Sequence, residues 1–255
     1  MKAFTSSKAV AYVLAVLLIF VLWKTISCVV NALLILPPPE DVFRALFQLI
    51  GKTVFWRHVG VTVLRCFISF LISMLIGSIV GCLCGISTFF NNFFAIPVAV
   101  IRATPVVSFI LIALFWFSSS HVPIFISILM TLPVVISSVS RGFATKDKKL
   151  EAMAKIYRFT NRQKARWITL PAVLPFFLSG AVSAFGLTWK VVVAGEVLSI
   201  PTLGAGALLQ SAQVHLNTAD VMAITFVIVA MSFLLEKLLA FTVSKIVLLK
   251  GKQHG

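Results

Sequence analysis

The stretch from Lys146 to Pro175, KDKKLEAMAKIYRFTNRQKARWITLPAVLP, separates two long hydrophobic runs and is the most basic part of the chain. Nine lysines and arginines fall between positions 141 and 166: Arg141, Lys146, Lys148, Lys149, Lys155, Arg158, Arg162, Lys164 and Arg166. A segment with so many charged side chains is too costly to place in the hydrocarbon core of a membrane. We therefore predict a polar loop over 141–171 between two membrane-crossing helices.

A helical pattern lies within this loop. Leu150, Met153, Ala154 and Tyr157 recur at i, i+3, i+4 and i+7, which places them in one apolar stripe on a short helix. We expect that helix to end at Asn161. Such a stripe either docks into a groove on another protein or lies on the membrane surface.

Composition identifies the class of protein. Of 255 residues, 60% are hydrophobic and 11% are charged, whereas a soluble domain carries about 25% charged residues. We therefore predict an all-α, polytopic membrane protein. The net charge of +15 would suggest a nucleic-acid partner in a soluble chain. Here the basic residues lie mainly between spans and no nucleic-acid-binding signature accompanies them, so we expect no such partner.

Six stretches are long enough to cross a hydrocarbon core of ~30 Å, which takes about 20 helical residues. We place them near 9–30, 60–85, 94–117, 122–140, 172–198 and 221–248, in a single transmembrane domain over 1–255. The first is expected to be retained rather than cleaved as a signal peptide. We also expect a short interfacial helix after Pro37–Pro39, and another short helix within 201–220.

Charge asymmetry predicts the orientation. Lysines crowd both ends of the chain and the 141–171 loop, whereas residues 118–121 and 199–220 contain no lysine or arginine. With six spans, both termini and the basic loop fall on the same side. The positive-inside rule assigns that side to the cytoplasm.

Three glycines in the second predicted span, Gly77, Gly81 and Gly85, are spaced four residues apart on one helix face. This small-xxx-small pattern lets another backbone approach closely. The neighbouring helix could belong to the same chain or to a second subunit.

Four ionisable residues fall inside predicted spans: Arg65, Arg102, Lys190 and Glu196. Such residues are costly in the membrane, so each is a candidate for a structural ion pair or for a contact with a transported solute. Lys190 and Glu196 lie six residues apart, about 240° around a helix, and are not expected to pair with each other.

The sequence contains no phosphate-binding Gly-x4-Gly-Lys-Ser/Thr, no His-Glu-x-x-His and no paired acid motif. The four cysteines have no Cys-x-x-Cys spacing, so we expect neither a metal site nor a disulfide. We predict no catalytic residues and no cofactor in this chain. Any ATP hydrolysis is expected on another subunit.

The basic loop resembles the cytoplasmic loop of permeases from binding-protein-dependent ABC importers, whose pattern is E-A-A-x3-G-x9-I-x-L-P. Ile168, Leu170 and Pro171 match its end, and Ala154 matches the second alanine. Ala152, Met153 and Arg158 stand at the glutamate, first alanine and glycine positions, and Glu151 lies one position early.

The chain is most similar to the nitrate, sulfonate and taurine branch of that family. This resemblance also covers Leu36-Pro37, Arg102-Ala-Thr-Pro105, Trp189 through Glu196 and Leu203-Gly204. It implies a permease of the bacterial inner membrane with the type I importer fold. It further implies a homodimer that works with two ATPase subunits, which bind ATP and Mg²⁺, and with an extracytoplasmic solute-binding protein.

In that family the 141–171 loop contacts the ATPase, and we refer to it below as the coupling loop. The positions that the resemblance assigns to this contact are Leu150, Glu151, Ala152, Met153, Ala154, Lys155, Tyr157, Arg158, Ile168, Leu170 and Pro171. The transported solute is expected to be a sulfonate-, taurine- or nitrate-like anion or a vitamin precursor.

Two other classes of function are weighed against this one. An ATPase-independent secondary transporter or channel is the main alternative, although no internal repeat favours it. A membrane-bound enzyme is the second, and the lack of a catalytic cluster counts against it.

Overall fold

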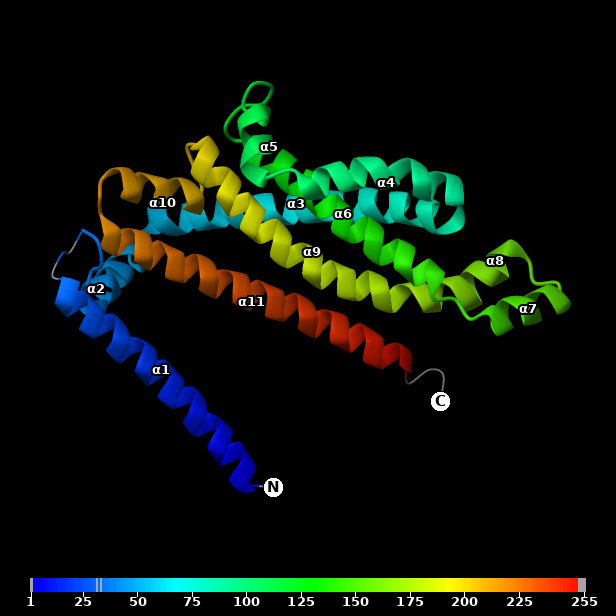
Figure 1. The fold of residues 1–255 in the computed structure, drawn as a ribbon, viewed down its shortest axis with the longest axis horizontal. Coiled ribbons are helices and arrows are strands. Elements are labelled where there is room, and N and C mark those ends of the chain that lie inside the picture. The colour runs from blue at the N-terminus through cyan, green and yellow to red at the C-terminus, as the bar shows by residue number, and fades with distance from the viewer. Residues whose placement is uncertain (1, 31, 33, 252–255) are drawn as a thin grey trace.

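The computed structural model describes residues 2–30, 32 and 34–251, and all regular secondary structure in those residues is helical. Figure 1 shows an elongated bundle with α7 and α8 projecting at one end and α2 and α10 at the other. The helices are α1 (Lys2–Val30), α2 (Pro39–Ile50), α3 (Thr53–Ile86), α4 (Thr88–Ala103), α5 (Val106–Ala113), α6 (Val122–Ala144), α7 (Lys148–Ile156), α8 (Asn161–Lys164), the π-helix η1 (Ala165–Thr169), α9 (Leu170–Ser199), α10 (Ala205–Val214) and α11 (Thr218–Gly251).

Among the described residues, five helical segments are long and apolar enough to cross a membrane: 10–30, 53–86, 122–144, 161–199 and 218–245. The predicted third span, 94–117, is wrong as a single helix. Its place is taken by α4 and α5, which meet at an angle of 95° and together make the sixth crossing if they are one broken span. The break falls at Thr104-Pro105, where Thr104 is extended. Proline disfavours helical backbone in the residue before it, which explains the break.

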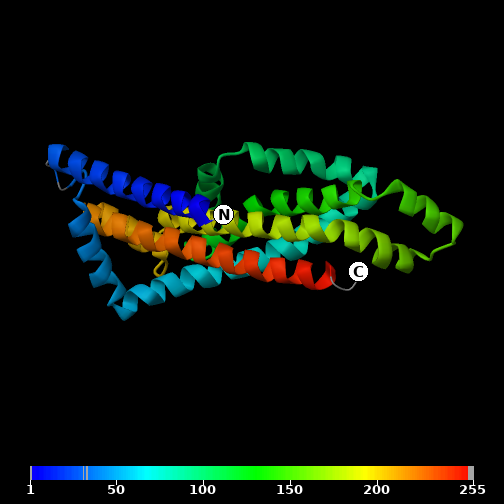
Figure 2. The same ribbon diagram turned by 90° about the horizontal axis from the view of Figure 1, so that it is seen from below.

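The core of the bundle is formed by α3, α6 and α9. One cluster of buried side chains joins them, with Phe70 from α3, Val135 and Val139 from α6, and Phe185 and Trp189 from α9. Figures 1 and 2 show α6 and α9 side by side, with α3 crossing them at an angle and α11 running along α9. The core lies at the depth of the membrane because each of its helices is an apolar span.

The three glycines of α3 lie against α6 of the same chain. A Cβ on Gly77 would be 2.7 Å from Cβ of Val135, and one on Gly81 would be 2.8 Å from Cβ of Val139. A Cβ on Gly85 would overlap the ring of Phe143. The small residues therefore let α3 and α6 approach closely within one subunit.

Substituting Gly81 by leucine is expected to lower stability by about 1–3 kcal/mol, because the added side chain overpacks against Val139. Gly60→Leu is the matched control in the same helix, since a Cβ there meets no atom within 4 Å. Unfolding midpoints of the purified proteins in detergent measure the difference. Equal midpoints for the two variants would show that α3 and α6 do not need the glycine.

The junction between α1 and α2 is held by polar contacts. The indole N–H of Trp23 donates to the carbonyl of Pro37 at 3.1 Å, and the hydroxyl of Ser27 donates to that of Leu36 at 2.9 Å. Lys24 and Glu40 form an exposed ion pair at 2.6 Å. Beyond this junction α1 diverges from the bundle (Figure 1), and most of its side chains are exposed in the single chain.

The short helix expected after Pro37–Pro39 is α2. Val42 and Ala45 are buried and pack with Ala223 of α11. Phe47 is 73% exposed in the single chain. Leu46 and Leu49 are partly buried against the same cluster, so α2 faces the bundle with both small and large apolar side chains.

Candidate functional site

The coupling loop begins where α6 ends and contains α7, α8 and η1 before α9. Asp147 caps α7, because its carboxylate accepts from the backbone N–H of Lys149 at 2.8 Å. Thr160 and Gln163 form a capping box at the start of α8. Figure 1 shows the loop projecting beyond the core helices, which leaves it accessible to another protein.

Asn161 begins α8 instead of ending α7, so the expected boundary is wrong. Helix α7 ends at Ile156, and the chain then turns through Arg158, which has a positive φ of 51°. The backbone N–H of Phe159 then donates to the carbonyl of Ala154 at 2.9 Å. A glycine occupies the position of Arg158 in the resembling pattern, and glycine adopts this conformation without strain.

The expected four-residue stripe does not form one exposed surface, because Ala154 is completely buried in the chain. Leu150 and Met153 are about 40% exposed, Tyr157 is 70% exposed, and Ile156, outside the predicted stripe, is 79% exposed. We call Leu150, Met153, Ile156 and Tyr157 the α7 apolar surface. It is rotated from the predicted stripe because α7 folds back against its own loop.

The remaining positions of the loop divide into buried and exposed ones. Glu151 pairs with Lys146 at 3.1 Å and lines a cavity of about 230 Å³ with Lys155 and Lys164. Ile168 is buried beside this cavity. The others are exposed: Ala152, Lys155, Arg158, Leu170 and Pro171. Only part of the expected ATPase-contact set is therefore free to meet a partner.

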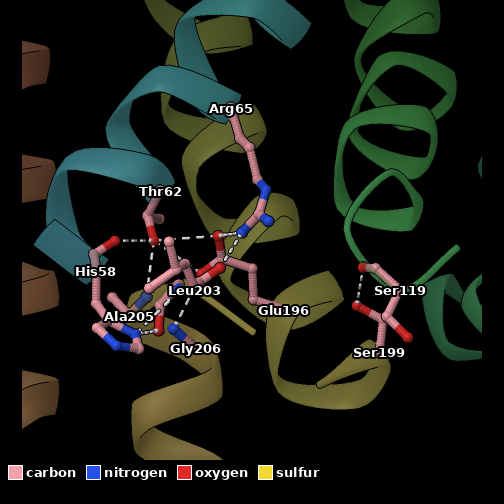
Figure 3. A network of polar contacts seen from close by, with 10 residues as sticks. His58, Thr62, Arg65, Ser119, Glu196, Ser199, Leu203, Ala205 and Gly206 are labelled. Atoms are coloured by element: carbon pink, nitrogen blue, oxygen red, sulfur yellow. Dashed lines mark hydrogen bonds and ion pairs between the residues drawn. The ribbon is translucent and has the colours of Figure 1, made fainter. Parts of the chain in front are cut away.

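A second polar site lies at the opposite end of the core, where Glu196 of α9 is completely buried (Figure 3). Its carboxylate forms an ion pair with Arg65 of α3 at 2.7 Å. It also accepts from the hydroxyl of Thr62 at 2.8 Å and from the backbone N–H of Gly206 at 3.0 Å. These donors satisfy the charge in a place that water does not reach.

The same network fixes the turn between α9 and α10. Arg65 donates to the carbonyl of Leu203 at 2.6 Å, and the N–H of Ala205 donates to Thr62 at 2.8 Å. The backbone N–H of Gly204 donates to Nδ1 of His58 at 3.1 Å. Gly204 has a φ of 157°, and a Cβ there would be 2.6 Å from Cδ of Glu196, so a side chain does not fit.

The four predicted intramembrane charges are not gathered in one place. Arg65 and Glu196 meet, whereas Arg102 donates to the carbonyl of Pro133 at 2.9 Å. Lys190 is exposed on α9. Sequence reasoning missed Thr62 and His58 of the network, because a threonine and a histidine near a span end carry no distinctive pattern.

In the residues that the structure describes, no group of three histidine, cysteine, aspartate or glutamate side chains could hold a metal ion. The Glu196 network lies at one end of the bundle and the α7 apolar surface at the other.

The sequence of this chain is similar to those of known proteins. Residues 73–246 match the family described as "Binding-protein-dependent transport system inner membrane component". SsuC of Escherichia coli (strain K12), named as an aliphatic sulfonates transport permease protein, is 31% identical over 77% of this chain and 74% of its own length. The taurine transport system permease protein TauC of the same strain is 27% identical over 88% of this chain and 82% of its own. The nitrate import permease protein NrtB of Leptolyngbya laminosa is 24% identical over 58% and 53%.

Proposed function

The chain belongs to the family of inner-membrane components of binding-protein-dependent transport systems, and we propose that two copies of it form the path by which a small anionic solute enters the cell. It is the permease subunit of an ABC importer and crosses the inner membrane several times. This membership favours an ATP-driven importer over the ATPase-independent transporter or channel.

The proposed driving force is ATP hydrolysis by two partner subunits, which bind ATP and Mg²⁺ and dock on the coupling loop. The observation that carries this proposal is the α7 apolar surface, where Ile156 and Tyr157 are more than two-thirds exposed on a loop rich in positive charge. Apolar side chains in water are stabilised by entering a groove on a partner protein. Closure of the ATPase pair would then move the loop and tilt α6 and α9, which flank it.

The outer end of the path is proposed to receive a solute from an extracytoplasmic binding protein. The relatives are named for sulfonates, taurine and nitrate, which supports an anionic solute for this chain as well. The buried network at Glu196 would hold α10 in a fixed position for that encounter.

ATP-dependent uptake tests the proposal. Vesicles that contain this chain, its ATPase and its binding protein should accumulate a labelled anion only when ATP is present on the side of the membrane where the ATPase lies. Uptake driven by an ion gradient without ATP would contradict it.

We propose that both termini and the coupling loop face the cytoplasm. In a cysteine-free background, Thr145→Cys should react with a membrane-impermeant maleimide only after the cells are opened, because it lies in the coupling loop. Ser211→Cys on α10 should react in cells whose outer membrane alone is permeable. Both side chains are exposed in the single chain. Labelling of both residues from outside would contradict the orientation.

A further inference from the structure

A cavity of about 470 Å³ opens between α9 and α11, within the membrane-spanning segments 161–199 and 218–245. Trp189 and Lys190 line it from α9, and Ser232, Phe233 and Glu236 line it from α11. Most of its wall is apolar. A lysine and a glutamate in such a cavity at membrane depth need a partner, because an ion without one is costly there.

The two charged groups do not neutralise each other by direct contact. In the part of the chain that the structure describes, the ion pairs involve neither Lys190 nor Glu236. Glu236 accepts a hydrogen bond from the hydroxyl of Ser232 at 3.0 Å. Its carboxylate lies against α9 at Gly186, where a Cβ would be 2.8 Å from Oε1. The carboxylate of Glu236 on α11 therefore lies against α9, about one helical turn along α9 from Lys190.

Trp189 and Lys190 both line the cavity, but only the lysine offers a donor to it. Trp189 is 2% exposed, and its indole N–H is the buried side-chain donor that has no hydrogen-bond partner among the described residues. This N–H has almost no accessible surface and lies in the packed core, so it is not a contact for a ligand in the open cavity. The ammonium group of Lys190 needs acceptors, because it carries three N–H donors.

The exposed face of α9 is polar where Lys190 lies. Ser179, Ser183 and Lys190 follow one another on this face at spacings of four and seven residues. Hydrocarbon chains favour an apolar helix face, whereas the wall of a solute path carries polar groups. The face and the cavity therefore belong to the same side of the permease.

We infer that the cavity is a site for a small zwitterion, whose oxyanion group lies at Lys190 and whose ammonium group lies at Glu236. The inference rests on the proposed function and narrows its solute from an anion to an amino-sulfonate or similar zwitterion. A simple anion would meet the repulsion of Glu236 in the same cavity. The headgroup of phosphatidylethanolamine has the same chemistry, so the experiment must separate solute from lipid.

The test measures ATP-dependent uptake by the complete transporter in vesicles, with labelled taurine, ethanesulfonate, nitrate and bicarbonate as probes. The wild type should transport taurine. Lys190→Gln and Glu236→Gln should each lower taurine uptake at least tenfold, and the double variant should stay as low. Lys190→Arg should keep most of the uptake. Lys52→Gln removes an exposed lysine outside the spans and should leave uptake unchanged. Assembly is checked by co-purification of the ATPase.

Four results would overturn the inference. Recovery of uptake in the double variant would mean that the two charges merely neutralise each other. Normal uptake in both single variants would remove any role for them. Defects confined to vesicles with phosphatidylethanolamine, and absent from vesicles of phosphatidylcholine and phosphatidylglycerol, would assign the site to lipid. Wild-type uptake of the other three probes without taurine would refute the zwitterion and leave the importer intact. Accumulation of taurine without ATP would instead refute the proposed function.

Discussion

Ile156→Asp is expected to reduce ATP-dependent uptake at least ~100-fold while the permease remains inserted and folded. Ile156 is 79% exposed, so the single chain loses no packing when it changes. In the assembled transporter the new carboxylate would be buried without a partner, which costs about 3–5 kcal/mol. Each 1.4 kcal/mol is about a tenfold change in binding. Uptake into vesicles and co-purification of the ATPase measure the effect.

Asn161→Asp is the matched control, since it adds the same charge to the same loop. Asn161 is exposed in the first turn of α8, where the helix N-terminus favours a negative charge. Near-normal uptake is expected for it. Ala154→Asp is a poor probe of docking, because Ala154 is completely buried and the variant would disrupt the loop itself. Full uptake by Ile156→Asp would exclude the α7 apolar surface from ATPase contact.

Glu196→Gln is expected to destabilise the permease by about 3–5 kcal/mol, because it leaves Arg65 buried and unpaired. The amide keeps the size of the side chain but loses the charge that Arg65, Thr62 and Gly206 stabilise. Yield in the membrane and the unfolding midpoint in detergent should both fall.

Glu40→Gln provides the comparison, since it breaks an ion pair with Lys24 of similar length whose side chains are about half exposed. Exposed pairs contribute about 0–1 kcal/mol, so its midpoint should hardly move. Arg65→Gln combined with Glu196→Gln should be less destabilising than the sum of the single changes. A Glu196→Gln protein that is as stable as the wild type but does not transport would assign Glu196 to the solute path instead.

Much of the fold follows from hydrophobic length and charge. The helical class and five of the crossings need only long apolar runs, and each of these expected spans overlaps a long helix. The third crossing was also expected, but hydropathy did not reveal its break, because the apolar run continues through Thr104-Pro105 although the backbone turns there. Hydropathy does not register such a turn.

The sequence predicted less of the coupling loop and of the Glu196 network, because a pattern along the chain does not show how segments pack. A helical period identifies which residues of α7 share a face, but not which face its own loop covers. Ala154 was therefore expected on the partner side, and Ile156 was overlooked. The partner of Glu196 was also unpredictable, because 131 positions separate it from Arg65 along the chain. Only the packing of α3 on α9 brings the two together.

The central claim is that the α7 apolar surface contacts the ATPase, and site-specific photo-cross-linking tests it most directly. A benzophenone amino acid at position 156 or 157 should yield an adduct with the ATPase subunit after irradiation of intact cells. The same amino acid at Val214, which is 67% exposed on α10 at the opposite end of the bundle, should yield none (Figure 1). Adducts with the ATPase from position 214, and none from 156 or 157, would contradict the account.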